Sequence, residues 1–272
     1  MTRVPPLDAD LATTPRVAWP SVLLTATMCA LAGCGAALAG AGHRGAGALS
    51  VYLAGWCGFT VLHEASHGNI ARVRWLNALA GELAASVILC RFLGFRQIHL
   101  RHHRYTNDPQ RDPDRFTGEG PWWQRPLRLA ATDLHYYFLF DPRALRASRG
   151  EHALSLGSAV TLAAAALSLL LTGHAVDALL VWVLPLRASM FTAALIVDFL
   201  PHMRPTSVPR VDDALGHTAQ VAPTPLTDAL SLCHTHHLLH HLWPRVPFYR
   251  LPSAWRRHGA ALRALGVTVR WG

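Results

Sequence analysis

The sequence predicts an all-α, polytopic membrane protein in which four transmembrane helices form two hairpins beside a cytoplasmic, histidine-rich helical cap. Three observations support this prediction. The 272 residues are 51% hydrophobic and only 15% charged, with a mean hydropathy of +0.21, which is typical of a one-domain membrane protein. Four apolar stretches are each about 20 residues long, the length that spans a bilayer core. The chain also has 17 histidines, many of them beside those stretches.

The four predicted spans are residues 21–42, 48–67, 153–173 and 178–200. Short turns join the first span to the second and the third to the fourth, so each pair is expected to form a hairpin. The polar segment before the first span is long for a signal peptide, which favours an uncleaved span. We therefore expect a cytoplasmic N-terminal segment at 1–20, a membrane domain at 21–255 and a basic cytoplasmic tail at 256–272.

Residues 76–95 form a further apolar segment that competes with this topology. As a full span it would place the histidines before it and after it on opposite sides of the membrane. It contains Glu82 and Arg91, and a charged side chain at the centre of a span costs about 2.5–3.5 kcal/mol on insertion scales. We therefore expect a re-entrant or interfacial helix here.

The distribution of arginine predicts the orientation in the membrane. All 25 basic residues are arginine, and all except Arg44 and Arg187 lie in the N-terminal segment, the middle segment or the tail. Positively charged loops stay in the cytoplasm, so we expect both termini and the middle segment on that side, most simply of the plasma membrane. The net charge of +9 is assigned to the membrane surface, because no nucleic-acid-binding motif accompanies it.

Three histidine boxes carry the strongest chemical signal. On a helix, residues three or four positions apart share one face, so each box would present its imidazoles together. Neutral imidazole is a preferred ligand of iron, zinc and copper, and so many rings exceed what one ion accepts. The first box is His63 and His67, the second His99, His102 and His103, and the third His237, His240 and His241, with His202 as an outlier between the second and third. The boxes therefore predict two metal ions.

The remaining single histidines and the cysteines are given ordinary roles. His43, His135, His152, His174, His217 and His258 have no partners at helical spacing, and an isolated histidine is usually a hydrogen-bonded surface or core residue. The five cysteines include no CxxC pair, and we interpret them as small buried hydrophobic residues.

Two other classes of protein must be weighed against a two-metal site. His63-Glu-Ala-Ser-His67 is also an HExxH motif, which in zinc proteases supplies two ligands and a glutamate base, so Glu64 could serve an intramembrane protease. A catalytic zinc needs only three protein ligands and an open position, whereas this chain offers three boxes. A non-catalytic metal-binding membrane protein is the third possibility, and metal analysis would separate the three.

An all-histidine two-metal site favours redox chemistry. Zinc has none, whereas two irons with open positions for O2 can share the electrons that O–O cleavage requires. Beside a bilayer, the substrate available for such an oxidant is a lipid hydrocarbon. The predicted reaction is therefore an O2-dependent oxidation of a hydrocarbon.

The boxes and their flanking residues resemble the membrane fatty acid desaturase superfamily, whose pattern is H-x(3,4)-H, H-x(2,3)-HH and H/Q-x(2,3)-HH. The flanking sequences are His-Gly-Asn after the first box, His-His-Arg-Tyr-Thr-Asn-Asp-Pro at the second, Asp-Phe-Leu-Pro-His ending at His202, and His-His-Leu-Trp-Pro-Arg-Val-Pro-Phe-Tyr-Arg at the third. Together they are similar to the bacterial branch that contains desaturase-like β-carotene hydroxylases. The resemblance covers about residues 48–255.

This resemblance implies a di-iron centre with the eight box histidines as ligands and His202 as the ninth. It also implies a lipid substrate from the bilayer and a separate electron donor, a ferredoxin, flavodoxin or cytochrome b5-type protein with its reductase. Residues expected to orient the ligands are Glu64, Asn107, Asp108, Asp112, Asp114, Asp198 and His234, although a plain turn also explains the acidic residues after the second box. The sequence leaves open acyl lipid or carotenoid as substrate, and desaturation, hydroxylation or ketolation as reaction.

Overall fold

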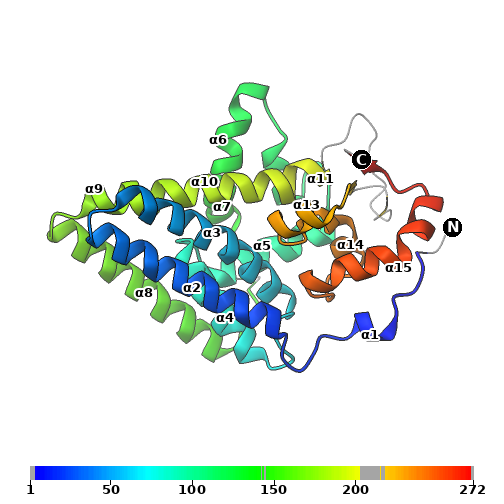
Figure 1. The fold of residues 1–272 in the computed structure, drawn as a ribbon, viewed down its shortest axis with the longest axis horizontal. Coiled ribbons are helices and arrows are strands. Elements are labelled where there is room, and N and C mark those ends of the chain that lie inside the picture. Colours follow the sequence, from blue (N-terminus) through cyan, green and yellow to red (C-terminus); the bar gives the residue numbers. More distant parts are fainter. Residues whose placement is uncertain (1–3, 142, 144, 203–214, 216–217, 271–272) are drawn as a thin grey trace.

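The computed structural model describes residues 4–141, 143, 145–202, 215 and 218–270, and most of them are helical (Figure 1). Four helical stretches are long and apolar enough to cross a membrane, as predicted, and a bent pair of helices would make a fifth if the pair is one span. They are α2 (Trp19–Gly40), α3 (Arg44–His67), α8 (Arg149–Leu171) and the continuous run Ala175–His202. In Figure 1 they occupy the left and centre, and the C-terminal part of the chain lies to the right.

Local signals explain where two of these helices begin. α2 starts earlier than predicted because Pro20 fits the first turn of a helix, where its missing N–H is not needed. α8 starts at Arg149 because Ser148 and Glu151 form a reciprocal capping box. Most side chains of α8 are exposed, as expected for a helix that faces lipid.

The fourth span is irregular. It runs through α9 (Ala175–Asp177), η4 (Ala178–Val183), α10 (Leu184–Ala193), η5 (Ala194–Phe199) and α11 (Leu200–His202), and η4 and η5 are π-helical. The helix therefore continues two residues beyond the predicted end at 200. This extension places His202 on the helical terminus beside the cap.

Residues 76–95 do not form one straight helix. α4 (Arg74–Val87) and α5 (Phe92–Tyr105) meet at a bend of 102°, and Leu89 between them has a φ of 61°. Each helix has 14 residues, which at about 1.5 Å per residue is shorter than a bilayer core. A bent pair of this kind fits either a broken span or a re-entrant segment, so the re-entrant or interfacial placement of residues 76–95 stays a prediction.

Close packing fixes α3 at the centre of the long helices. A Cβ atom on Gly47 would lie 2.9 Å from the carbonyl oxygen of Gly35 in α2, and one on Gly55 would lie 2.8 Å from Ser189 Oγ in α10. Small residues thus let α2 and α10 approach α3 closely. α8 packs mainly on α4 instead, and Ser158 donates a hydrogen bond to Glu82.

The cap consists of short elements that surround the ends of these helices. After α5 come η1 (Pro113–Thr117), η2 (Trp122–Gln124), α6 (Arg125–Ala130) and α7 (Thr132–Leu139), and after the fourth span come α13 (Pro225–Leu230), η6 (His234–His236), α14 (His237–Leu242), η7 (Phe248–Arg250) and α15 (Leu251–Ala264). The short N-terminal helix α1 (Ala9–Ala12) packs Leu11 into a second core with α14 and α15.

One feature departs from the predicted all-α class. β1 (Gln220–Val221) and β2 (Val269–Arg270) form a two-stranded parallel pair in which Gln220 lies opposite Val269. Two-residue strands are too short to give the alternating pattern by which strands are predicted. The pair ties the end of the chain to the segment that precedes α13.

Candidate metal centre

Nine histidines converge where the long helices meet the cap, and they form two adjacent groups. Within each group, one ring nitrogen from every histidine lies within 4.8 Å of those from all the others. Group A consists of His63, His67, His99, His103 and His240, and group B consists of His102, His202, His237 and His241. These are the nine histidines that the boxes and the outlier predicted as ligands.

Helical spacing decides which histidine joins which group. α3 supplies both members of the first box, four positions apart, to group A. α5 and α14 each divide their histidines between the two groups, and α11 completes group B. Because two helices serve both groups, the groups are neighbours: the rings of His103 and His241 stack with their centroids 4.3 Å apart.

The nitrogens within each group face one another at short distances. In group A, His99 Nε2 lies 2.7 Å from His67 Nε2 and 3.2 Å from His103 Nε2. In group B, His237 Nε2 lies 3.1 Å from His202 Nε2 and 3.0 Å from His241 Nε2. Two nitrogens that bind one ion at about 2.1 Å and at right angles are about 3.0 Å apart. The spacing fits imidazoles that share a metal ion.

Burial gives a second reason to place metal here. Both ring nitrogens of His63 are buried and have no hydrogen-bond partner among the described residues, which is unfavourable unless another group satisfies them. Burial also keeps most cap imidazoles uncharged, as metal ligation requires. The histidines whose pKa burial lowers well below its usual value are His99, His103, His237, His240 and His241.

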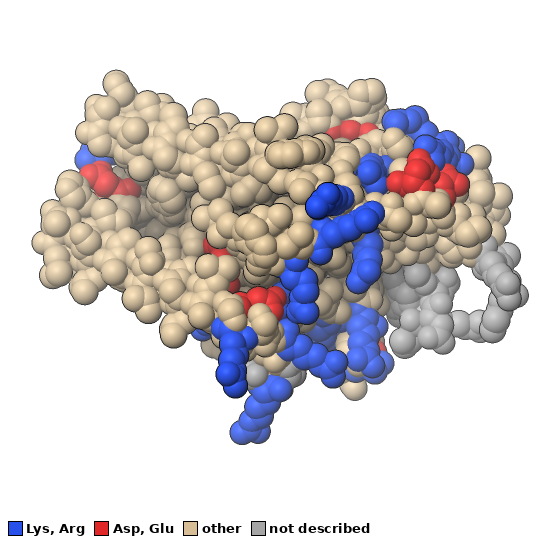
Figure 2. Space-filling model, turned by 90° about the horizontal axis from the view of Figure 1, so that it is seen from below, with Lys and Arg blue, Asp and Glu red and all other residues tan. Residues whose placement is uncertain are grey.

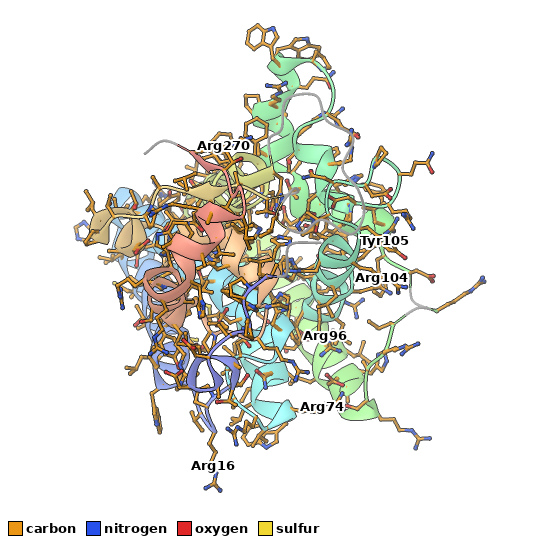
Figure 3. The ribbon with its side chains drawn as sticks, turned by 90° about the vertical axis from the view of Figure 1, so that its right-hand side faces the viewer. Arg16, Arg74, Arg96, Arg104, Tyr105 and Arg270 are labelled. Carbon is orange, nitrogen blue, oxygen red and sulfur yellow. The ribbon has the colours of Figure 1, made fainter. Side chains whose placement is uncertain are left out.

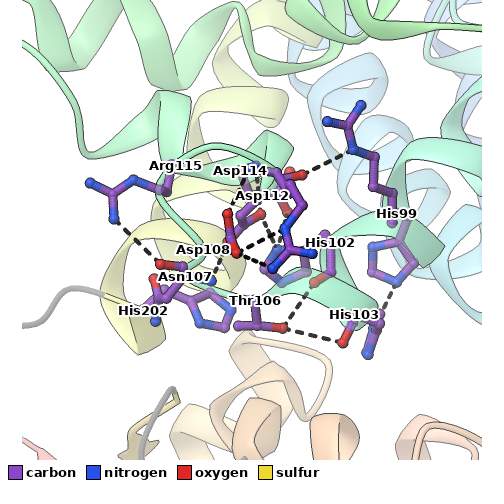
Figure 4. Close-up of polar contacts among 12 residues, drawn as sticks. His99, His102, His103, Thr106, Asn107, Asp108, Asp112, Asp114, Arg115 and His202 are labelled. Atoms are coloured by element: carbon purple, nitrogen blue, oxygen red, sulfur yellow. Dashed lines mark hydrogen bonds and ion pairs between the residues drawn. The ribbon is translucent and has the colours of Figure 1, made fainter. Parts of the chain in front are cut away.

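Two carboxylates lie close to the ring of His102 (Figure 4). Its Nδ1 lies 2.8 Å from Asp112 Oδ1 and 3.3 Å from Asp114 Oδ2. Burial alone would lower the pKa of His102, but Asp114, Asp112 and Asp198 raise it to about 10. With Nδ1 directed at carboxylates, Nε2 is left for the metal, and it lies 3.3 Å from His241 Nε2. This is the carboxylate–histidine–metal arrangement seen in metal sites.

The turn after α5 builds this acidic contact. Asn107 has a φ of 62° and donates its backbone N–H to Asp112 Oδ2, which fixes the Asp112 carboxylate. Asp108 faces away from the histidines and pairs with Arg111 at 2.6 Å. Of the acidic residues that follow the second box, Asp112 and Asp114 therefore contact a histidine, whereas Asp108 stabilises the surface of the turn.

Glu64 and His234 lie beside group A but make other contacts than expected. Glu64 Oε1 is 3.9 Å from His63 Nδ1, too long for a hydrogen bond, and Glu64 Oε2 accepts one from the backbone N–H of Phe248 at 3.0 Å. His234 Nε2 lies 3.1 Å from Thr60 Oγ1. Glu64 thus connects α3 to the C-terminal part of the cap, and His234 connects α3 to η6.

Sequence reasoning missed two aromatic residues that contact the site. Tyr136 in α7 donates a hydrogen bond from its hydroxyl to Asp114 Oδ1, and the ring of Phe95 stacks on His99 at 5.5 Å. The position of Phe95, four residues before His99 in a helix, was a usable signal. Tyr136 gave none, because it is 22 positions from Asp114 and belongs to no motif.

Comparison with known proteins assigns the class. A family model described as fatty acid desaturase matches residues 41–272, so the chain belongs to the fatty acid desaturase family, as its boxes and flanking residues indicated.

Individual relatives are distant. The chain is 32% identical to the Delta(12) fatty acid desaturase fat-2 of Caenorhabditis elegans over 84 residues. This aligned stretch covers 31% of this chain and 21% of that protein. It is 37% identical over 54 residues to an sn-1 oleoyl-lipid 12-desaturase of Picosynechococcus, which covers 20% of this chain and 16% of that protein. It is 26% identical over 216 residues to a β-carotene ketolase of Haematococcus lacustris, which covers 75% of this chain and 59% of that protein. The chain thus matches less than two thirds of each relative's length.

Proposed function

We propose that this protein is a membrane-bound di-iron oxidoreductase that uses O2 and two electrons to desaturate or hydroxylate a lipid hydrocarbon. The observation that carries the proposal is the convergence of nine histidines, all buried or half-buried, in two adjacent groups. Bound iron would supply the oxidising chemistry that breaks an unactivated C–H bond. Groups A and B would hold the two ions, and the carboxylates of Asp112 and Asp114 would orient His102.

An apolar pocket supports a hydrocarbon as substrate. It has a volume of about 130 Å³, lies between α5, α7 and the start of α8, and its lining includes Leu93, Phe95, Phe140 and Leu145. On its inner side the Phe95 ring contacts His99 of group A. A hydrocarbon chain that enters here from the bilayer would approach the histidines while the surrounding side chains exclude water.

The position of the arginines supports a cytoplasmic cap. Basic side chains gather over the cap end of the molecule and are sparse over the long helices (Figure 2). Arg16, Arg74, Arg104 and Arg270 lie on this same end (Figure 3). We therefore propose that this end faces the cytoplasm, with both termini on that side of the plasma membrane. A separate ferredoxin, flavodoxin or cytochrome b5-type donor with its reductase would deliver electrons there, and one relative is named as an sn-1 acyl-lipid omega-3 desaturase (ferredoxin).

A carotenoid ring is a second candidate substrate. The β-carotene ketolase aligns over 216 residues, whereas the desaturase relatives align over 49 to 86 residues. The longer alignment favours a carotenoid, and the higher identities over shorter stretches favour an acyl chain.

The zinc-protease alternative agrees less well with the structure. A protease would need Glu64 free to activate water, but its two oxygens accept hydrogen bonds from Asn69 and from the backbone of Phe248. The two histidines of the HExxH motif also share group A with three further histidines, more ligands than a catalytic zinc uses.

Expression in a host that makes β-carotene tests the proposal. Lipid and pigment extracts would be compared by mass spectrometry with those from cells that express the His99→Ala variant. A hydroxylated or ketonated pigment would identify a carotenoid substrate, and a new double bond in the acyl chains would identify an acyl lipid. Purified protein with two irons per chain is expected, whereas one tightly bound zinc and no oxidised product would refute the proposal.

A further inference from the structure

The two histidine groups have unequal surroundings. In group B, His102 Nδ1 contacts the carboxylates of Asp112 and Asp114. In group A, the carboxylate adjacent to a ligand is Glu64, and it stays 3.9 Å from His63 Nδ1. Acidic neighbours would therefore raise the basicity of one ligand of a metal held in group B. Glu64 would not do the same for a ligand of a metal held in group A.

Tyr136 fixes the orientation of the Asp114 carboxylate relative to His102. The Tyr136 side chain is buried, with 7% of its surface exposed, and its hydroxyl donates to Asp114 Oδ1. The other oxygen, Oδ2, lies 3.3 Å from His102 Nδ1. The carboxylate thus joins the phenol on one side to the imidazole on the other. Without the phenol, one oxygen of a buried carboxylate would lose its donor, which is costly.

The helix that carries Tyr136 is itself anchored to the fourth span. Arg187 in α10 donates two hydrogen bonds to Asp133 in α7, at 2.7 Å and 2.8 Å, and a third to the carbonyl oxygen of Ala130. Asp133 precedes Tyr136 by three positions and so lies on nearly the same face of α7. This bidentate pairing has a fixed geometry, and it holds the phenol in place from a helix that also ends in a group B ligand, His202.

We propose that Tyr136 is a positioning residue that acts through Asp114 and His102 on one metal position only, that of group B. The inference rests on the proposed di-iron function and adds to it an inequality between the two positions. The Tyr136 ring also lies 6.0 Å from the ring of Phe95, which stacks on His99 of group A. Loss of the hydroxyl alone leaves that ring contact in place, so the effect of the hydroxyl passes through Asp114 and the orientation and basicity of His102. Loss of such an outer partner typically weakens metal affinity 10- to 100-fold.

The test is the Tyr136→Phe variant, which removes the hydroxyl and keeps the ring. Tyr137→Phe is the matched control, because it removes a hydroxyl from the neighbouring residue, which is half exposed. Both variants and the wild-type chain are purified in detergent, stripped of metal and titrated with ferrous iron without O2. Mössbauer spectra of samples loaded with iron-57 then show whether one or both iron signals change.

We expect the wild-type chain and Tyr137→Phe to bind two irons alike. In Tyr136→Phe one of the two dissociation constants should rise about 10- to 100-fold, and the signal of one iron should change while the other is kept. Two irons with unchanged dissociation constants and spectra in Tyr136→Phe would refute the role of Tyr136. A wild-type chain that binds fewer than two irons would refute the di-iron function itself.

A second variant covers the case in which Tyr136→Phe fails to fold. Asp114→Asn keeps the size of the side chain and removes the charge that faces His102, so it should weaken the same single iron site. If Asp114→Asn folds, binds two irons and gives the wild-type spectrum, the path from Tyr136 to His102 is excluded.

Discussion

Each histidine box brings its imidazoles close together because its members lie at most four positions apart on a helix. Each histidine of a box contributes one ring nitrogen to its group. The distance from this nitrogen to its neighbours is close to that between two ligands of one metal ion, for example 3.2 Å between His99 Nε2 and His103 Nε2. This regularity is why the eight box histidines could be predicted from their spacing to lie together, whereas His202 was included from its place in the family resemblance. Tyr136 and the bidentate Arg187–Asp133 pair could not, because their partners are distant in the sequence and only the tertiary fold brings them together.

At a single ligand, His102→Ala should abolish turnover and reduce the iron content. It removes an Nε2 from group B and leaves Asp112 and Asp114 without the imidazole between them. His174→Ala is the control, because His174 lies on the exposed turn before α9 and its side chain is 59% exposed. Iron per chain and product formed would be measured for both. Full activity in His102→Ala would contradict the assignment of His102 as a ligand.

At the scale of the helix, small residues set the distances between spans. The structure identifies the glycines on which this packing depends. Gly47→Ala should lower the free energy of unfolding by about 1–3 kcal/mol, the usual cost of overpacking, because its Cβ would lie 2.9 Å from a backbone oxygen of Gly35.

The control for this helix contact is Gly45→Ala in the same turn of α3, where a Cβ meets nothing within 4 Å. Alanine in that open position should leave the helix unchanged or stabilise it slightly. Thermal unfolding in detergent would compare the two variants. Equal melting temperatures would show that α2 and α3 do not depend on close contact at Gly47.

The anchoring of α7 to α10 is testable at the same scale. Arg187→Leu leaves Asp133 without its cation, and the two side chains are only 22% and 10% exposed. Breaking a fully buried pair costs about 3–5 kcal/mol, so this partly exposed pair should cost less. The double variant Arg187→Leu/Asp133→Leu should recover part of the loss. A double variant less stable than Arg187→Leu alone would argue against an ion-pair anchor.

Across the whole molecule, the basic side chains and the two histidine groups lie toward the same end. The four predicted spans followed from hydropathy, and the charges of Glu82 and Arg91 argued against a fifth span. The bend of 102° and the packing of α8 on α4 did not follow, because hydropathy carries no information about which helices touch.

This arrangement predicts the topology in the cell. With the cap in the cytoplasm, the turn near Gly173 must lie on the opposite side of the membrane. α8 and the fourth span are each a single candidate span, and this turn joins them. A single cysteine at position 173, in a variant whose five cysteines are replaced by alanine, should react with a membrane-impermeant maleimide in intact spheroplasts. A cysteine at position 104 in the cap should react only after lysis. Labelling of position 104 in intact spheroplasts would place the histidine groups on the outer side and remove them from a cytoplasmic electron donor.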